Sequence, residues 1–155
     1  MKSKPDRQLH ASNRIWIVAG CVLAAIGVSF GAIGAHLLEK LLTPKQQELW
    51  DTGVQYQMYM AFGLLVLGLC GEVPRSKLVG ILMLAGALLF SGCLYAYALT
   101  DVKPLVHIVP IGGFAMIAAW LILAWSVFGS RNKACLLYTS PSPRDATLSR
   151  MPSSA

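Results

Sequence analysis

IWIVAGCVLAAIGVSFGAIGAHLL, residues 15–38, contains no Lys, Arg, Asp or Glu and is long enough to cross a membrane as a single helix. A transmembrane α-helix needs about 20 predominantly apolar residues to span roughly 30 Å of hydrocarbon. Three more uncharged stretches follow, separated by short charged segments, at residues 52–71, 78–100 and 104–130. The pattern predicts an all-α polytopic membrane protein, a four-transmembrane-helix bundle with spans at 15–38, 54–71, 78–100 and 106–129.

The composition agrees with a membrane protein. Of the 155 residues, 55% are hydrophobic and 13% are charged, so a soluble fold would expose large apolar patches. One membrane domain is therefore expected at residues 15–130, between a short N-terminal segment at 1–14 and a short end at 131–134. The net charge of +6 comes from basic residues at the ends of spans. Because they form no stripe, we expect the lipid bilayer as the surroundings and no nucleic acid as a partner.

The distribution of basic residues predicts an orientation. Eight lie before the first span, between the second and third, or after the fourth: Lys2, Lys4, Arg7, Arg14, Arg75, Lys77, Arg131 and Lys133. Three lie on the other side: Lys40, Lys45 and Lys103. Cytoplasmic flanks collect Lys and Arg, so both termini are predicted to be cytoplasmic. A cleavable signal peptide is the alternative for the first span, but its apolar run is longer than a typical signal.

The C-terminal stretch at residues 135–155 differs abruptly from the rest and is rich in Ser and Pro. Its residues can be read as the translation of a transposase-type sequencing adapter followed by an index. We interpret the stretch as an artefact without function, the alternative being a natural disordered tail.

The remaining cysteines are Cys21, Cys70 and Cys93, all within spans or at their ends. An odd number of thiols argues against a disulfide framework, and no zinc-type Cys/His spacing is present. No metal site and no cofactor are predicted.

Small residues recur along one face of the first predicted helix: Gly20, Ala24, Gly27, Gly31 and Gly34. The fourth span has a weaker version that includes Gly112. Such faces let membrane helices approach closely. Packing within the bundle is the preferred interpretation, and a homodimer interface is the alternative.

Two prolines indicate helix boundaries. Thr43-Pro44-Lys45-Gln46 offers an N-cap, a proline at the first helical position and a Gln three residues after the cap, so a helix should start near Pro44. Pro110 has no N–H to donate, so the fourth helix should start there or be kinked.

A series of motifs resembles the domain-of-unknown-function family 423, small four-span proteins of bacterial inner membranes whose eukaryotic relatives are called transmembrane protein 256. The motifs are Gly31-Ala-Ile-Gly-Ala-His36, Trp50 with Tyr56-Gln-Met-Tyr59, Leu84-Ala-Gly86, Phe90-Ser-Gly-Cys-Leu-Tyr95 and Pro110-Ile-Gly-Gly113. Met60 stands where many members have a histidine. The resemblance implies a fold and an inner-membrane location, and it implies no established activity.

The predicted topology places a set of polar residues in the outer half of the bundle: His36, Tyr56, Gln57, Ser91, Tyr95, Thr100 and His107. They form either an outward-facing pocket, in which a histidine could titrate near neutral pH, or a structural cluster whose members hydrogen-bond to one another.

Three classes of function follow. We favour a structural, assembly or accessory role in the plasma membrane, as a homodimer or within a larger membrane complex. A small transporter or channel with the outward-facing polar pocket is the alternative, although no intramembrane carboxylate is present to couple protons. An enzyme or haem protein ranks third, and no catalytic residue is predicted.

Overall fold

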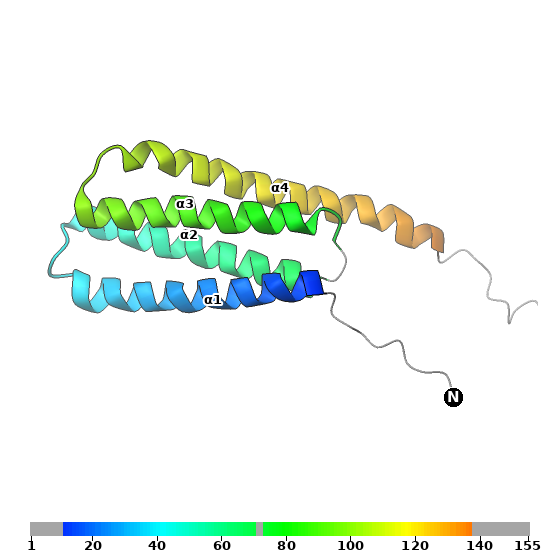
Figure 1. Ribbon diagram of the computed structural model, residues 1–155, viewed down its shortest axis with the longest axis horizontal. Helices are drawn as coiled ribbons and strands as arrows, with labels where there is room; N and C mark the ends of the chain where they lie inside the picture. Colours follow the sequence, from blue (N-terminus) through cyan, green and yellow to red (C-terminus); the bar gives the residue numbers. More distant parts are fainter. Residues whose placement is uncertain (1–10, 71–72, 138–155) are drawn as a thin grey trace, which may run out of the picture.

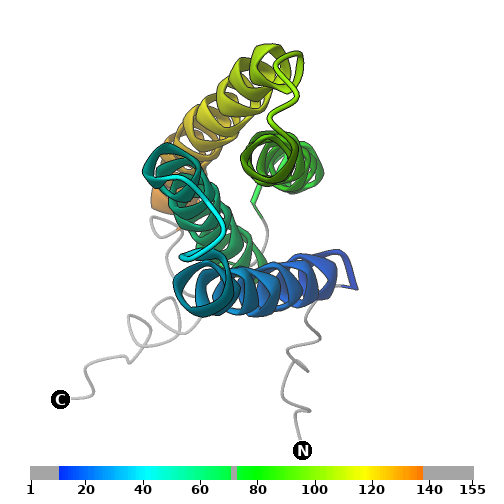
Figure 2. The ribbon, with the colours of Figure 1, turned by 90° about the vertical axis from the view of Figure 1, so that its left-hand side faces the viewer.

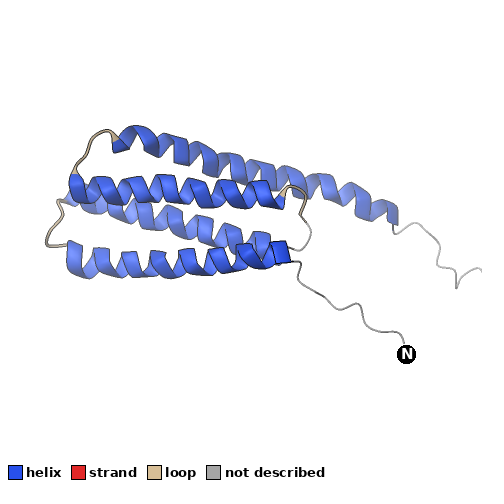
Figure 3. Cartoon of the chain, in the orientation of Figure 1, coloured by secondary structure: helices blue, strands red, loops and turns tan. Residues whose placement is uncertain are grey.

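Four long helices make up the chain in a computed structural model that describes residues 11–70 and 73–137 (Figures 1 and 3). They are α1 (Ala11–Ile33), α2 (Pro44–Leu69), α3 (Ser76–Thr100) and α4 (Leu105–Leu137), and a short π-helix, η1 (Gly34–Leu38), extends α1. The described residues contain no strand, so the predicted all-α class is confirmed. Residues 1–10 of the N-terminal segment and 138–155 of the proposed artefact lie outside the described part.

Within the described residues, three segments are long and apolar enough to cross a membrane: Arg14–Leu38, Ser76–Thr100 and Leu105–Phe128. The remaining long helix, α2, falls short of this composition over its described residues. Its first turns carry Lys45, Glu48 and Asp51, and its middle carries Gln55 and Gln57. Three of the four predicted spans are therefore supported by length and composition.

The helices form an open series in which each packs on the next. α1 packs on α2, α2 on α3 and α3 on α4, and α1 makes only slight contact with α3. Seen along the helices, α1 and α4 lie at opposite ends of this series (Figure 2). The most apolar window of α3 is 44% buried, against 22% for α1 and 17% for α4. α1 and α4 are thus edge helices, each with a broad face that no other helix covers.

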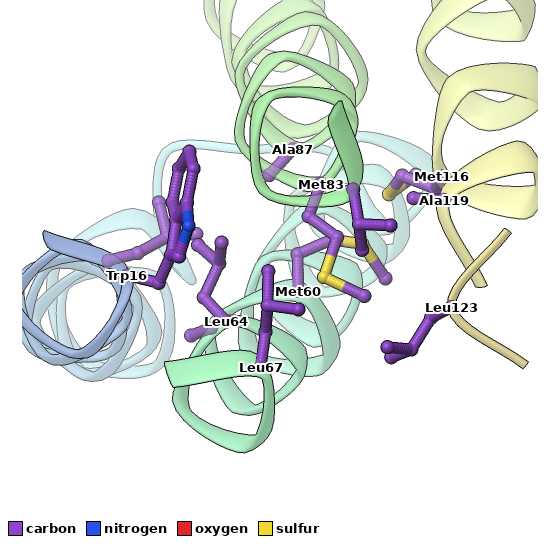
Figure 4. Packing of buried hydrophobic residues seen from close by; sticks show 12 residues of the cluster. Trp16, Met60, Leu64, Leu67, Met83, Ala87, Met116, Ala119 and Leu123 are labelled. Atoms are coloured by element: carbon purple, nitrogen blue, oxygen red, sulfur yellow. The ribbon is translucent and has the colours of Figure 1, made fainter. Parts of the chain in front are cut away.

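The main hydrophobic core takes side chains from all four helices and centres on α2 and α3 (Figure 4). Ala61, Leu64, Leu67, Val79 and Met83 are fully buried in it. Its α1 members are Trp16 and Leu23, and its α4 members are Met116, Ala119 and Leu123. The core therefore holds the series of helices together.

The small-residue face of α1 lies against α2. A Cβ atom at Gly20 would be 2.8 Å from the Ala61 carbonyl oxygen, and one at Gly27 would be 2.8 Å from Met58 Sδ. Further along, a Cβ at Gly34 would lie 2.7 Å from the Trp50 ring, and one at Gly31 would lie 3.5 Å from Val54. Ala24 is partly buried against the main core. α1 therefore uses this face to pack on α2 within the same chain.

α3 and α4 approach closely at two glycines. A Cβ at Gly112 would lie 2.6 Å from the backbone nitrogen of Phe90 and 3.0 Å from the Gly86 carbonyl oxygen. Because backbone atoms cannot move aside as a flexible side chain can, only glycine fits at position 112.

The N-terminus of α2 has the predicted capping box. Thr43 Oγ1 accepts from the Gln46 backbone N–H at 3.4 Å, and Gln46 Oε1 accepts from the Thr43 backbone N–H at 2.9 Å. α2 then continues without a break past Trp50. Pro110 lies inside α4, which begins at Leu105, so the alternative of a helix start at Pro110 is wrong.

Candidate functional site

A buried amide at the middle of α2 connects three helices. Gln57 on α2 is 4% exposed. Its Nε2 donates to the Leu23 carbonyl oxygen of α1 at 2.9 Å, and its Oε1 accepts from the Tyr95 hydroxyl of α3 at 2.9 Å. A buried polar group without a partner would cost roughly 1–3 kcal/mol, so these bonds fix the relative rotation of the three helices. The amide has a protein partner at each end.

Three aromatic rings pack beside this amide. Tyr95 contacts Trp50 with ring centroids 4.6 Å apart and meets Phe30 edge-on at 4.9 Å. Phe30 and Trp50 are 5.5 Å apart, and Trp50 Nε1 donates to the Phe30 carbonyl oxygen at 2.9 Å. The Tyr95 ring fits because position 53 is glycine, where a Cβ would be 2.7 Å from Tyr95 Cε1. We call Phe30, Trp50, Gln57 and Tyr95 the outer cluster.

Sequence reasoning included Gln57 and Tyr95 but missed Phe30 and Trp50 as their neighbours. Trp50 is 4% exposed. Trp50 and Gln57 are seven residues apart, which places both on one face of a helix, and this spacing could have predicted that they are neighbours.

Two other predicted site residues lie nearby without joining this hydrogen-bond network. Ser91 on α3 is 1% exposed, and its Oγ has no hydrogen-bond partner. Tyr56 on α2 is 40% exposed and packs against Phe90 and Tyr59, with centroid distances of 4.9 and 5.7 Å.

The remaining predicted site residues are exposed. His36 lies on η1, and His107 lies in the first turn of α4. Thr100 ends α3 and donates to the Ala96 carbonyl oxygen at 2.6 Å. The structure thus joins Gln57 to Tyr95 and leaves both histidines at the surface, and a ligand site built from the whole set stays a prediction. Among the described residues, no three His, Cys, Asp or Glu side chains are placed to hold a metal ion.

Two hollows mark the surface of α2. The outer polar hollow, about 750 Å³, is lined by Gln47, Glu48, Asp51, Thr52 and Gln55 together with Pro44 and Val54. Gln47 Nε2 donates to Asp51 Oδ1 at 3.1 Å within it. The second, which we call the α2–α4 groove, has a volume of about 430 Å³ and is lined by Tyr56, Tyr59, Met60, Phe62, Met116 and Trp120. Sequence reasoning found neither.

Comparisons with known proteins agree on one family. Residues 30–113 match the family model described as "Protein of unknown function (DUF423)". UPF0382 membrane protein SH2409 of Staphylococcus haemolyticus is 38% identical over 117 residues, which are 74% of this chain and 96% of that protein. UPF0382 membrane protein YwdK of Bacillus subtilis is 39% identical over 114 residues, 71% of this chain and 93% of that protein.

Haemophilus influenzae has a similar protein as well. A UPF0382 membrane protein of Haemophilus influenzae is 37% identical over 108 residues, which are 68% of this chain and 86% of that protein. No solved structure matches this chain. The matched region includes the outer cluster, the capping box and the Gly112 contact, and the chain belongs to the DUF423 family of membrane proteins of unknown function.

Proposed function

We propose that this chain is a four-span accessory protein of the bacterial inner membrane, which assembles with a second membrane protein or a second copy and catalyses no reaction. One observation carries the proposal: the buried amide of Gln57 has partners at both ends, Leu23 and Tyr95, inside the chain. Polar side chains at membrane depth usually mark ligand or ion paths, unless they pair with one another. Here the bonds serve to join helices.

The direction of the helices supports α2 as the fourth span. α1 and α3 run in the same direction, and α2 returns between them (Figure 1). If α1 and α3 both cross outward, α2 must bring the chain back. Residues 52–69 carry no formal charge. At 1.5 Å per residue they cover about 27 Å, close to the hydrocarbon thickness.

The same topology supports an orientation with both termini in the cytoplasm. The α1–α2 and α3–α4 loops share one end of the molecule, and Arg14, Arg75 and Lys77 lie at the other. The excess of basic residues at that end favours cytoplasmic termini.

The uncovered face of α1 is the favoured surface for assembly. It carries Cys21, Ala25, Ser29 and Ala32, all exposed. The Ser29 hydroxyl donates to the Ala25 carbonyl oxygen at 2.9 Å, so the polar group is satisfied within its own helix. Small residues on a lipid-facing surface allow another helix to approach closely.

The test is photo-crosslinking in the native membrane. A benzophenone amino acid replaces Val28, which is 63% exposed beside Ser29 on the uncovered face of α1, and the matched control replaces Ile117 of α4, which is 58% exposed. We expect a protein adduct at position 28 that is at least fivefold stronger than at 117. Lipid adducts alone at both positions, together with a monomer after purification in mild detergent, would contradict the proposal.

A transporter or channel is the second candidate, and the outer polar hollow is the observation that favours it. Glu48 and Asp51 could attract a cationic solute there. This candidate predicts that a small cation raises the melting temperature in detergent and that Glu48→Gln or Asp51→Asn removes the effect. Equal melting temperatures with and without a panel of organic cations would speak against it.

A further inference from the structure

The α2–α4 groove is formed where two helices that are not neighbours in the series come close. Trp120 of α4 reaches over to α2, because a Cβ at Gly63 would lie 3.1 Å from its Cζ2. Tyr56 packs against Phe90 of the intervening α3 at 4.9 Å. Side chains of α2 and α4 line a hollow of about 430 Å³, within the roughly 300–1,000 Å³ typical of small-molecule sites.

The groove is apolar and adaptable. Its lining carries aromatic rings and the thioethers of Met60 and Met116, which are flexible and polarisable. The Tyr59 hydroxyl in this lining already accepts a hydrogen bond from Gln55 Nε2 at 2.9 Å. A ligand with many hydrogen-bonding groups would lose its hydration there without replacement. The chemistry therefore favours a hydrocarbon.

The volume decides what kind of apolar partner fits. An α-helix with its side chains is about 10–12 Å across, so even three turns occupy more than about 1,000 Å³. The groove holds less than half of that. A helix of a second copy or of another protein is therefore too large to enter as a whole. A single flexible hydrocarbon chain can enter.

The depth of the groove agrees with such an occupant. Met116 and Trp120 lie in the central part of the candidate span Leu105–Phe128. Phe62, on the α2 wall, is 54% exposed, so the groove is accessible from the side. It opens toward the hydrocarbon of the bilayer, where acyl chains are at high concentration.

We propose that the α2–α4 groove binds one acyl chain of a membrane phospholipid as a specific, retained ligand. The inference rests on the proposed membrane crossing of α2 and is independent of the proposed assembly face on α1. A chain in the groove contacts α2 and α4 together, which otherwise meet mainly through α3. Because a ligand that binds only the folded state stabilises it, the melting temperature will depend on phospholipid.

The experiment uses the full chain in vesicles that contain phosphatidylglycerol with a diazirine near the end of one acyl chain. After photolysis, proteolysis and mass spectrometry map the labelled residues. We expect labelling at Tyr59 and Met116 to exceed that at Phe114 of α4 at least fivefold. Phe114 is 72% exposed and does not line the groove, so it reports ordinary lipid contact. Stronger or equal labelling at Phe114 would overturn the proposal.

Two variants test the groove itself. Phe62→Trp adds ring bulk at its exposed wall, and Met116→Phe stiffens the opposite wall. Each should reduce labelling at Tyr59 at least threefold, whereas the matched control Phe114→Trp should leave it unchanged. If one groove variant fails to fold, the other decides. Unchanged labelling in a folded variant overturns the proposal.

The outcome is separable from the assembly proposal. If labelling shows no preference for the groove while protein crosslinking at Val28 remains, only the acyl-chain proposal is refuted. If the groove is labelled preferentially but no protein adduct forms at Val28, only the assembly proposal is refuted.

Discussion

The outer cluster and the α3–α4 contact hold helices together by different means. Gln57, Trp50 and Tyr95 use directed hydrogen bonds and ring contacts between α1, α2 and α3. Gly86 and Gly112 bring the α3 and α4 backbones together without a side chain between them. In lipid, where hydrophobic burial favours no particular helix pair, both means are available. We therefore expect the hydrogen-bonded contact to tolerate conservative change better than the backbone contact.

The largest effect is expected at the backbone contact. Gly112→Leu places a side chain against Phe90 N, which cannot move without displacing α3, and we expect a loss of about 3 kcal/mol of unfolding free energy. Reversible unfolding in mixed micelles measures it. Gly113→Leu is the matched control, since a Cβ there meets only the Phe90 ring at 3.8 Å. Equal losses for the two variants would show that general helix packing, and not this contact, sets the stability.

The hydrogen-bonded cluster should lose less, and its losses should not add. Tyr95→Phe removes the donor to Gln57 Oε1 and keeps the ring, so we expect a loss of about 1–2 kcal/mol. Gln57→Leu should cost a similar amount. The double variant leaves neither partner unpaired, and its cost should fall below the sum of the two by at least about 0.5 kcal/mol. Additive losses in mixed-micelle unfolding would mean that the bond contributes no coupling.

How much of this the sequence predicted depends on the kind of interaction. Local patterns predicted the helices: uncharged runs predicted four long helices, of which three are candidate spans, and Thr43, Pro44 and Gln46 predicted the start of α2. Apart from the small-residue face of α1, the face that each helix turns inward could not be predicted. Phe62 is 54% exposed while Leu64, two residues later, is fully buried. Lipid and core are both apolar, so hydrophobicity does not distinguish the two directions.

Aromatic residues illustrate the same limit. Trp50 is 4% exposed and Trp125 is 73% exposed, although the two side chains are identical. The Gln57–Tyr95 bond depends on the rotation of two helices separated by a loop, which no local pattern encodes. The π-helical turn at Gly34–Leu38 was likewise not predicted. Its first residue, Gly34, packs on Trp50, because a Cβ there would lie 2.7 Å from the ring.

The smallest effect is expected at His36, which is an exposed member of the predicted polar set. His36 is exposed on η1, so His36→Ala should change the unfolding free energy by less than about 0.5 kcal/mol. Tyr95→Phe serves as the buried comparison in the same assay. A loss of 1 kcal/mol or more at His36, on the order of a net hydrogen bond, would mean that the histidine has a partner in the membrane. In that case the outer cluster extends to η1, and an outward-facing site regains support.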